Sequence, residues 1–329
     1  MALERVNIEL YIYTGTSGVY TDTDLKYTLS KEKLSSENNI IIEIAQLVRD
    51  YIDQDFNNNY LSSTVWVTLI AQYIDKDTGL EYPSNGTQSF TYLAFDGFGY
   101  YEDEINPTLS QHALYTSNYI YIPEGENGKF PIFAEGVGKV NVGGSDTQIT
   151  DSGNSSQKIQ YITVPDDSGT LTVYDTDDTT VLKTVNVVSI CEPKYTPYKV
   201  TFVNKFGAYQ DIHFFKKTVE TFNAEDQVYK RNNINTSTVT YATNKGQQQR
   251  YNVNAITSLS ANTGFVNEDF TSAIEEMFLA ENVWIRYEGK TLPIIPKSKS
   301  FVQKSSVNDK LINYTVDFEF AFNKINNVR

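Results

Sequence analysis

The chain has 329 residues, of which 40% are hydrophobic, and its 41 Asp and Glu against 27 Lys and Arg give a formal net charge of −14. The length predicts two or three domains with apolar cores. The acidic balance argues against a nucleic-acid-binding protein, because binding a phosphate backbone requires basic groups that displace counterions. The only cysteine, Cys191, excludes an internal disulfide, and we expect it to be a small buried side chain.

Residues 1–135 are predicted to form an α+β domain. At the start of the chain, Val6, Ile8, Leu10 and Ile12 alternate with polar residues, which indicates a strand and not the apolar segment of a signal peptide. Apolar residues at helical spacing then predict a helix from Ile40 that ends near Phe56 and is capped by Asn38 or Asn39. No run approaches the roughly 20 apolar residues of a membrane helix, so we expect a soluble protein made in a cytoplasm.

The rest of this domain is predicted to be mostly strand. The expected elements are a strand over 63–73, a turn at 77–79 with a return strand, strands at 90–94 and 119–122, and a short helix over 107–114. Asn85-Gly86 has the composition of a tight turn.

Residues 136–192 predict a small all-β module inserted between its neighbours. Gly and small polar residues dominate its first half. The second half has strands at 159–164, 170–174 and 181–190, separated by Asp-, Gly- and Thr-rich turns.

Residues 193–329 predict a β-rich C-terminal domain with one helix. Its strands are expected at 199–204, 209–215, 235–243, 250–256, 283–287, 292–300 and 312–322. The last strand has Tyr314, Val316, Phe318, Phe320 and Phe322 on one face, as in a half-buried strand. The helix is expected over 268–279, with Asn267 as its cap and an apolar stripe of Phe270, Ile274, Met277 and Phe278. The fold class is therefore α+β and mainly β, with antiparallel or barrel-like sheets that each pack one helix.

Two acidic motifs have the residue types of cation sites. Asp22-Thr23-Asp24 places two carboxylates two residues apart, and Asp175, Asp177 and Asp178 crowd one turn. Neither has the spaced Gly and terminal Glu of a calcium loop. We therefore predict a polar loop and a solvated hairpin turn.

Glu102, Asp103 and Glu104 follow Tyr100 and Tyr101, and carboxylates flanked by aromatic residues are typical of glycosidases. A solvated acidic loop is the alternative, and we favour it. Asp96-Gly97-Phe98-Gly99 lacks the phosphate loop and catalytic loop of a kinase. The two histidines, His112 and His213, have no motif that places them beside Cys191. We predict no enzyme, catalytic residue, cofactor or metal.

Basic residues at Lys216-Lys217, Lys230-Arg231, Lys297, Lys299 and Lys304 predict a local positive patch. In a chain of this charge, we expect its partner to be an acidic surface of a neighbouring subunit. Nucleic acid is the alternative partner.

Three C-terminal segments carry a resemblance to a known class of proteins. They are Tyr198–Gly207 (YKVTFVNKFG), Asn262–Glu268 (NTGFVNE) and Val307–Phe322 (VNDKLINYTVDFEFAF). These segments resemble a virion structural protein of tailed bacteriophages, and they are most similar to those of phages that infect Bacteroidetes, including crAss-like phages. The resemblance implies a component of a tail, neck ring or baseplate located in the virion, and it implies no catalytic residue.

We therefore expect a homo-oligomeric ring that contacts other tail or neck proteins, with DNA present only in transit through its lumen and with no membrane partner. A negative inner wall repels phosphates and lets DNA pass. A tail-tip module that binds carbohydrate or a receptor is the alternative, motivated by the all-β middle region and the 24 tyrosines. A cell-wall hydrolase that uses Glu102 and Glu104 is the third reading.

Overall fold

The computed structural model describes residues 3–325 except 35, 62, 76, 80, 83–86, 105–111, 192–193, 235–236 and 298–310. Its contacts divide the chain into two units. The first unit comprises Met1–Cys191, Thr201–Ile212 and Asp269–Asn282, and the second comprises Glu192–Val200, His213–Glu268 and Val283–Arg329. The division into three domains at 135 and 192 stays a prediction.

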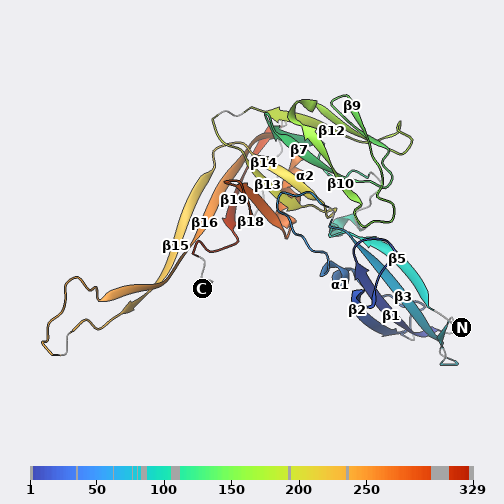
Figure 1. The fold of residues 1–329 in the computed structure, drawn as a ribbon, viewed down its shortest axis with the longest axis horizontal. Helices are drawn as coiled ribbons and strands as arrows, with labels where there is room; N and C mark the ends of the chain where they lie inside the picture. Colours follow the sequence, from blue (N-terminus) through green and yellow to red (C-terminus); the bar gives the residue numbers. More distant parts are fainter. Residues whose placement is uncertain are drawn as a thin grey trace. The chain divides into compact units, whose positions relative to one another are not determined.

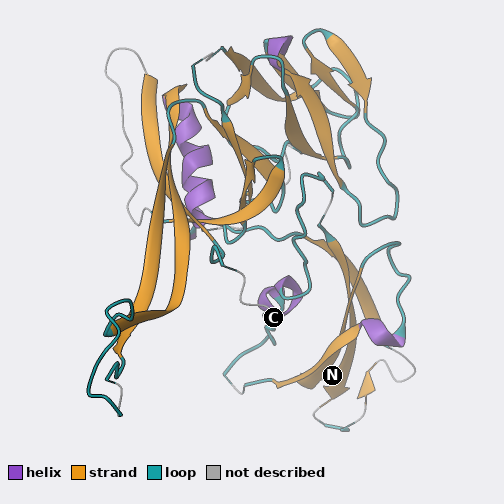
Figure 2. Cartoon of the chain, turned by 60° about the vertical axis from the view of Figure 1, so that its left-hand side comes forward, coloured by secondary structure: helices purple, strands orange, loops and turns teal. Residues whose placement is uncertain are grey.

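The described residues are mostly strand, as Figure 2 shows, so the predicted class, α+β and mainly β, is confirmed. Every strand pair whose register is described is antiparallel except one, the parallel pair of β6 with β12. The described part holds two α-helices, α1 and α2, and neither has the length and apolar content needed to cross a bilayer.

A five-stranded sheet begins the first unit. Its strands are β1 (Leu3–Tyr13), β2 (Leu25–Glu32), β3 (Val65–Asp75), β4 (Glu81–Tyr82) and β5 (Gln88–Ala94), in the order β2-β1-β3-β4, with β5 also paired to β3. The predicted opening strand, the strand over 63–73 and the return strand are confirmed. Gly79 ends the predicted turn with φ +64° and donates its amide to the Asp75 carbonyl at 2.8 Å.

The predicted helix over 40–56 is wrong in extent, because α1 comprises only Ala45–Arg49. The run Ile40-Ile41-Ile42 is β-branched and loses side-chain freedom in a helix. The Glu43 carboxylate also accepts the Ala45 amide at 2.9 Å, a local bond that competes with helix formation. Val48 of α1 and the following Ile52 still pack on Leu10, Ile12, Val65 and Val67 of the sheet.

The middle of the first unit contains two further sheets. A two-stranded sheet pairs β7 (Asn127–Phe133) with β10 (Ile159–Pro165), and a five-stranded sheet has the order β6-β12-β11-β8-β9. The strands of the second are β6 (Tyr119–Pro123), β8 (Lys139–Val142), β9 (Ser145–Gln148), β11 (Thr170–Tyr174) and β12 (Val181–Ile190). The predicted strands at 119–122, 159–164, 170–174 and 181–190 are confirmed.

Strands β7, β8 and β9 were not predicted from the sequence. Gly143 and Gly144, at φ +57° and +87°, form the tight turn between β8 and β9, and left-handed residues of this kind are what a two-residue hairpin turn needs. The helix predicted over 107–114 lies largely outside the described residues, and Asn85-Gly86 lies wholly outside them.

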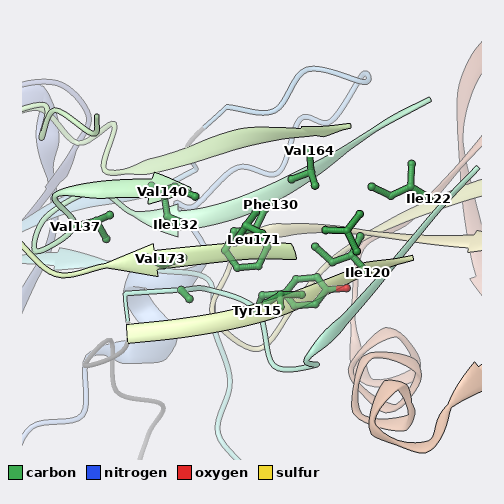
Figure 3. Close-up of a cluster of buried hydrophobic side chains, with 13 residues drawn as sticks. Tyr115, Ile120, Ile122, Phe130, Ile132, Val137, Val140, Val164, Leu171 and Val173 are labelled. Atoms are coloured by element: carbon green, nitrogen blue, oxygen red, sulfur yellow. The ribbon is translucent and has the colours of Figure 1, made fainter. Parts of the chain in front are cut away.

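One apolar core joins these two sheets, and Figure 3 shows it. Phe130 of β7 and Leu171 of β11 are fully buried at its centre. The ring of Tyr115 packs against that of Phe130, with the ring centroids 5.3 Å apart. The other buried members are Ala113, Ile120, Ile122, Ile132, Val137, Val140, Val164, Val173, Val185 and Val187.

The fourth sheet has seven strands in the order β14-β13-β17-β18-β19-β16-β15. They are β13 (Tyr198–Val203), β14 (Tyr209–Phe214), β15 (Val219–Lys230), β16 (Gln248–Asn267), β17 (Val283–Tyr287), β18 (Lys290–Pro296) and β19 (Leu311–Phe320). The predicted aromatic face of the last strand is confirmed for Tyr314, Val316, Phe318 and Phe320, which are buried. Phe322 lies beyond the strand and is exposed.

Helix α2 (Thr271–Leu279) confirms the predicted C-terminal helix, but the predicted cap is wrong. The 3-10 turn Glu268–Phe270 precedes it, so the N-cap position falls on Phe270 and not on Asn267. The predicted members Phe270, Ile274 and Met277 of its apolar stripe are buried.

The strand predicted over 235–243 is wrong. Its described residues form turns with one isolated bridge between Ile234 and Tyr241. The strand predicted over 250–256 is instead part of the 20-residue strand β16, and its partner β15 was not predicted at all.

Candidate assembly surface

The most exposed feature of the second unit is a long β-hairpin, which we call the arm. It consists of the antiparallel pair of β15 and the first part of β16, with the connecting residues 231–247. All twelve residues of β15 and the first six of β16 are exposed. Only Ser258–Asn267 of β16 pair with β19, so residues 248–257 have β15 as their sole strand partner among the described residues. Figure 1 shows the two strands running on beyond β18 and β19.

Cross-strand contacts hold the arm together. Arg250 Nε and Asp226 Oδ2 are 2.8 Å apart, Arg231 donates to Gln249 Oε1 at 2.9 Å, and the rings of Tyr229 and Tyr251 meet edge to face at 5.6 Å. Such exposed pairs contribute about 0.2–1 kcal/mol each. They suffice to set the register of a hairpin but leave its outer faces without apolar cover.

A β-bulge interrupts the arm near its middle. The register shifts between Glu225 and Gln227, and on the opposite strand Asn252 has φ +50°. A bulge adds local twist and bends the strand that carries it. It therefore sets the direction in which the outer half of the arm points.

The outer half of the arm is basic in an acidic protein. Residues 227–253 contain Lys230, Arg231, Lys245 and Arg250 and no Asp or Glu, a net charge of +4 that leaves −18 on the rest of the chain. The arm thus accounts for the Lys230-Arg231 part of the predicted positive patch. Lys297 of that patch is paired with Glu319, Nζ to Oε1 at 2.8 Å, and Lys299 and Lys304 lie outside the described residues.

The first unit contains a cavity of about 640 Å³ beside α1. Its lining is mainly apolar: Ile44, Ala45, Val48, Ile52, Val67, Tyr92, Leu93, Ala94, Phe95, Phe98 and Phe206, with Gln46, Arg49 and Lys205 as the polar members. Arg49 is held by two carboxylates, through Nε to Asp96 at 2.9 Å and through the guanidinium to Glu281 at 3.1 Å. The charge of Arg49 is therefore compensated within the wall.

The turn at Asn204–Gly207, between β13 and β14, forms one wall of this cavity through Lys205 and Phe206. Asn204 is fully buried, and its side-chain oxygen accepts the amides of Phe206 and Ala208, both at 3.1 Å. The Lys205 carbonyl accepts the Phe98 amide at 2.9 Å, which fixes the turn against the loop after β5.

Gly207→Ala tests how closely this turn packs. Gly207 has φ +76°, and a Cβ there would lie 2.8 Å from the Asp96 amide nitrogen. The left-handed backbone costs about 1–2 kcal/mol and the clash about 1–3 more, so we expect a loss of about 3 kcal/mol in the free energy of unfolding. The measurement is urea unfolding followed by Trp66 fluorescence in a Trp284→Phe background, because Trp66 then reports the first unit alone.

The matched control is Gly125→Ala, at φ +80° in the same unit and with open space around its Cβ. It shares the backbone cost without the clash, and we expect a loss of about 1 kcal/mol. Equal losses in the two variants would contradict the close approach of the turn to Asp96.

A buried carboxyl group in α2 was missed by the sequence analysis. Glu276 is 1% exposed and accepts hydrogen bonds from the Thr116 hydroxyl and, at 3.5 Å, from the Lys205 amide. Burial raises the pKa of Glu276 above its ordinary value, and these hydrogen bonds act against the rise. Nearby, the Lys183 ammonium donates to the Thr116 carbonyl at 3.0 Å. The arrangement joins α2 to the segment before β6.

Glu276→Gln is expected to remove a pH dependence of stability. Because the folded pKa is raised, the folded chain holds this proton where the unfolded chain has lost it. The contribution of Glu276 to stability then falls as pH rises from 4.5, the unfolded value, through the folded pKa. We expect Glu276→Gln to gain stability relative to wild type across that window, by on the order of 1 kcal/mol, in urea unfolding measured at several pH values. Glu275→Gln changes the same charge one residue earlier and serves as control. A difference that stays flat with pH would contradict the prediction.

The acidic motifs lie on turns. Asp24 Oδ2 accepts the Thr21 amide at 2.8 Å and caps the 3-10 turn Asp22–Asp24. Asp177 accepts the amides of Thr179 and Thr180 at 2.8 and 2.7 Å and the Thr180 hydroxyl at 2.6 Å, and these bonds lower the pKa of its carboxyl. No group of three or more His, Cys, Asp or Glu side chains in the described residues is placed to hold a metal ion.

Glu102, Asp103 and Glu104 are exposed on a single 3-10 turn and its end. The two tyrosines beside them differ in setting. Tyr101 is fully exposed, whereas the Tyr100 ring packs against Phe98 at 6.0 Å and lies under Lys205 Nζ at 5.5 Å. The structure therefore does not present these tyrosines as a paired aromatic platform.

The prediction that Cys191 is buried is wrong, because its side chain is exposed. Strand β12 ends at Ile190, so Cys191 comes directly after the last residue of the sheet. His112 stacks on Phe133 with ring centroids 5.9 Å apart, and His213 is buried beside Phe215.

Comparisons of the chain with protein-family models, with curated proteins and with solved structures find no match.

Proposed function

We propose that the chain is a structural component of a bacteriophage tail, neck or baseplate, and that it assembles as a homo-oligomeric ring through which DNA passes. The observation that carries the proposal is the arm, together with the resemblance of the C-terminal segments to virion structural proteins.

The arm supports the proposal because both of its faces are exposed to solvent although they carry apolar side chains. A two-stranded hairpin is marginally stable by itself in water. This one also exposes apolar side chains along its length: Val219, Phe222, Val228, Tyr229, Tyr251 and Val253. Exposed apolar surface of this kind marks protein–protein contacts, so a partner that covers the arm explains both its length and its residues.

The edge of the sheet supports the same reading. Strand β15 is the last strand in the order of the seven-stranded sheet. An edge strand offers unpaired backbone groups to another chain. Charged residues at Glu220, Glu225, Asp226 and Lys230 restrict that pairing to a partner of matching charge.

The charge of the chain supports passage of DNA. With the basic outer arm in contact with a partner, the remaining chain carries −18. Like charge repels phosphates and gives DNA no counterions to exchange. A lumen lined by this surface lets DNA slide without binding.

Electron microscopy and sedimentation of the purified full-length protein test the proposal. We expect closed rings with a central opening, an equilibrium that shifts to larger species with concentration, and no retention of DNA at physiological salt. Mass spectrometry of phage particles is expected to detect the chain. A protein that stays monomeric at every concentration and is missing from particles would overturn the proposal.

A further inference from the structure

The tip of the arm exposes three apolar side chains, and basic residues flank it along the chain at Lys230, Arg231 and Lys245. Ile234 and Tyr241 pair through an isolated bridge and are 58% and 71% exposed, and Val239 is 83% exposed. Val239 also has φ +50°, an unfavourable conformation for a β-branched residue that costs on the order of 1–3 kcal/mol. Exposed apolar side chains at the end of a projection mark a contact with a partner.

The cavity beside α1 is concave and apolar, and acidic residues, not basic ones, predominate in the segment that borders it. Its volume of about 640 Å³ lies within the roughly 300–1,000 Å³ of pockets that enclose small ligands, so it accommodates a few side chains. Its lining is apolar, and the segment from Ile40 to Tyr60 that borders it contains Glu43, Asp50, Asp53 and Asp55, all exposed. Arg49, the only basic residue in that segment, is already paired with Asp96 and Glu281.

We propose that the apolar tip of the arm of one copy inserts into the cavity beside α1 of a neighbouring copy, with Lys230 and Arg231 against the acidic residues that border it. The charges are opposite, because residues 227–253 carry +4 and the segment from Ile40 to Tyr60, with its four carboxylates and Arg49, carries −3. The other basic residue of the lining, Lys205, lies over the rings of Tyr100 and Phe206. Apolar residues on one side meet an apolar lining on the other.

This contact rests on the proposed function, and it specifies the surface of the neighbouring copy to which the arm binds. The arm and the cavity are different surfaces, so each copy gives one and receives the other. Such a head-to-tail contact builds a ring when the rotation between copies closes.

Photo-crosslinking in the full-length protein tests the contact. A benzophenone amino acid replaces Val239, and equal amounts of unlabelled and ¹⁵N-labelled protein are mixed before irradiation. We expect crosslinks from Val239 to residues 44–52, 92–99 or 205–206, in peptides of mixed isotope composition that prove contact between copies. The same amino acid at Val181, an exposed valine outside the arm at 53%, is expected to give no crosslink to those residues.

Charge exchange provides the second measurement. Lys230→Glu with Arg231→Glu is expected to raise the dissociation constant between copies at least tenfold, and Asp50→Lys with Asp53→Lys to restore it in part. All four side chains are exposed, and circular dichroism checks that each variant is folded. Restored association in the variant that carries both pairs of substitutions shows that the loss came from charge and not from a damaged arm.

The possible outcomes distinguish a failure of this contact from a failure of the proposed function. Oligomers whose Val239 crosslinks map elsewhere, or only within one copy, overturn the contact and leave the ring standing. A monomer at every concentration overturns both. If the wild-type protein retains DNA, and Lys230→Glu with Arg231→Glu abolishes that retention while the oligomers persist, the arm binds nucleic acid and the contact is overturned.

Discussion

Replacing residues 226–253 by Asn-Gly is expected to abolish self-association while the free energy of unfolding of the monomer stays within about 0.5 kcal/mol of wild type. Glu225 and Asn254 are paired in the arm, so the two-residue turn joins facing positions. None of the described residues removed is buried. Sedimentation over a range of concentrations measures assembly, and urea unfolding of dilute protein measures stability without the contribution of association.

Leu34→Ser and Val181→Ser are the controls for this shortened arm. Each removes an exposed apolar side chain outside the arm, and both proteins are expected to assemble as wild type does. If the shortened protein still forms the same oligomers, the arm is not the assembly surface and the main support of the proposed function fails.

Phe130→Ala is expected to give the largest loss of stability, about 3–5 kcal/mol, because it removes a buried ring and leaves a cavity. Phe130 is fully buried between the two sheets of the middle region and packs against Tyr115 (Figure 3). A loss of this size is a large part of the total stability of a typical domain. Urea unfolding with Trp66 as the single fluorescent reporter in a Trp284→Phe background measures it in the unit that contains Phe130.

Phe90→Ala is the matched control. Phe90 lies in β5 with its ring 40% exposed, so the same change of side chain is expected to cost about 1 kcal/mol or less. Equal losses at the two positions would show that Phe130 is not enclosed as described.

A buried face made strand β19 predictable from the sequence, whereas strand β15, which has no buried face, was not predicted. In β19 the aromatic residues fall at every second position because one face is buried. Strand β15 has both faces exposed, and Val219, Phe222 and Val228 do not alternate with polar residues. Without a buried face there is no period of two to detect.

The features that matter most for function depend on distant parts of the chain. The cavity brings together α1, the end of β5 and the turn at Lys205-Phe206. Glu276 is buried because Thr116 and Lys205 reach it from far along the sequence. The spacing of residues along a helix does not distinguish a buried glutamate such as Glu276 from an exposed one. Local sequence patterns therefore indicated neither its burial nor the cavity.

Three separate segments of the chain make up the first unit, so this unit cannot be completed until late in synthesis. Residues 1–191 leave the ribosome first, but the unit also needs Thr201–Ile212 and Asp269–Asn282. At about 5–20 residues per second, the 91 residues from 192 to 282 take roughly 5–20 s to emerge. Throughout that interval the nascent unit lacks α2, so the Thr116 hydroxyl cannot yet donate its hydrogen bond to Glu276. No single cut in the gene separates the two units, and the first unit is complete only after residue 282 has emerged.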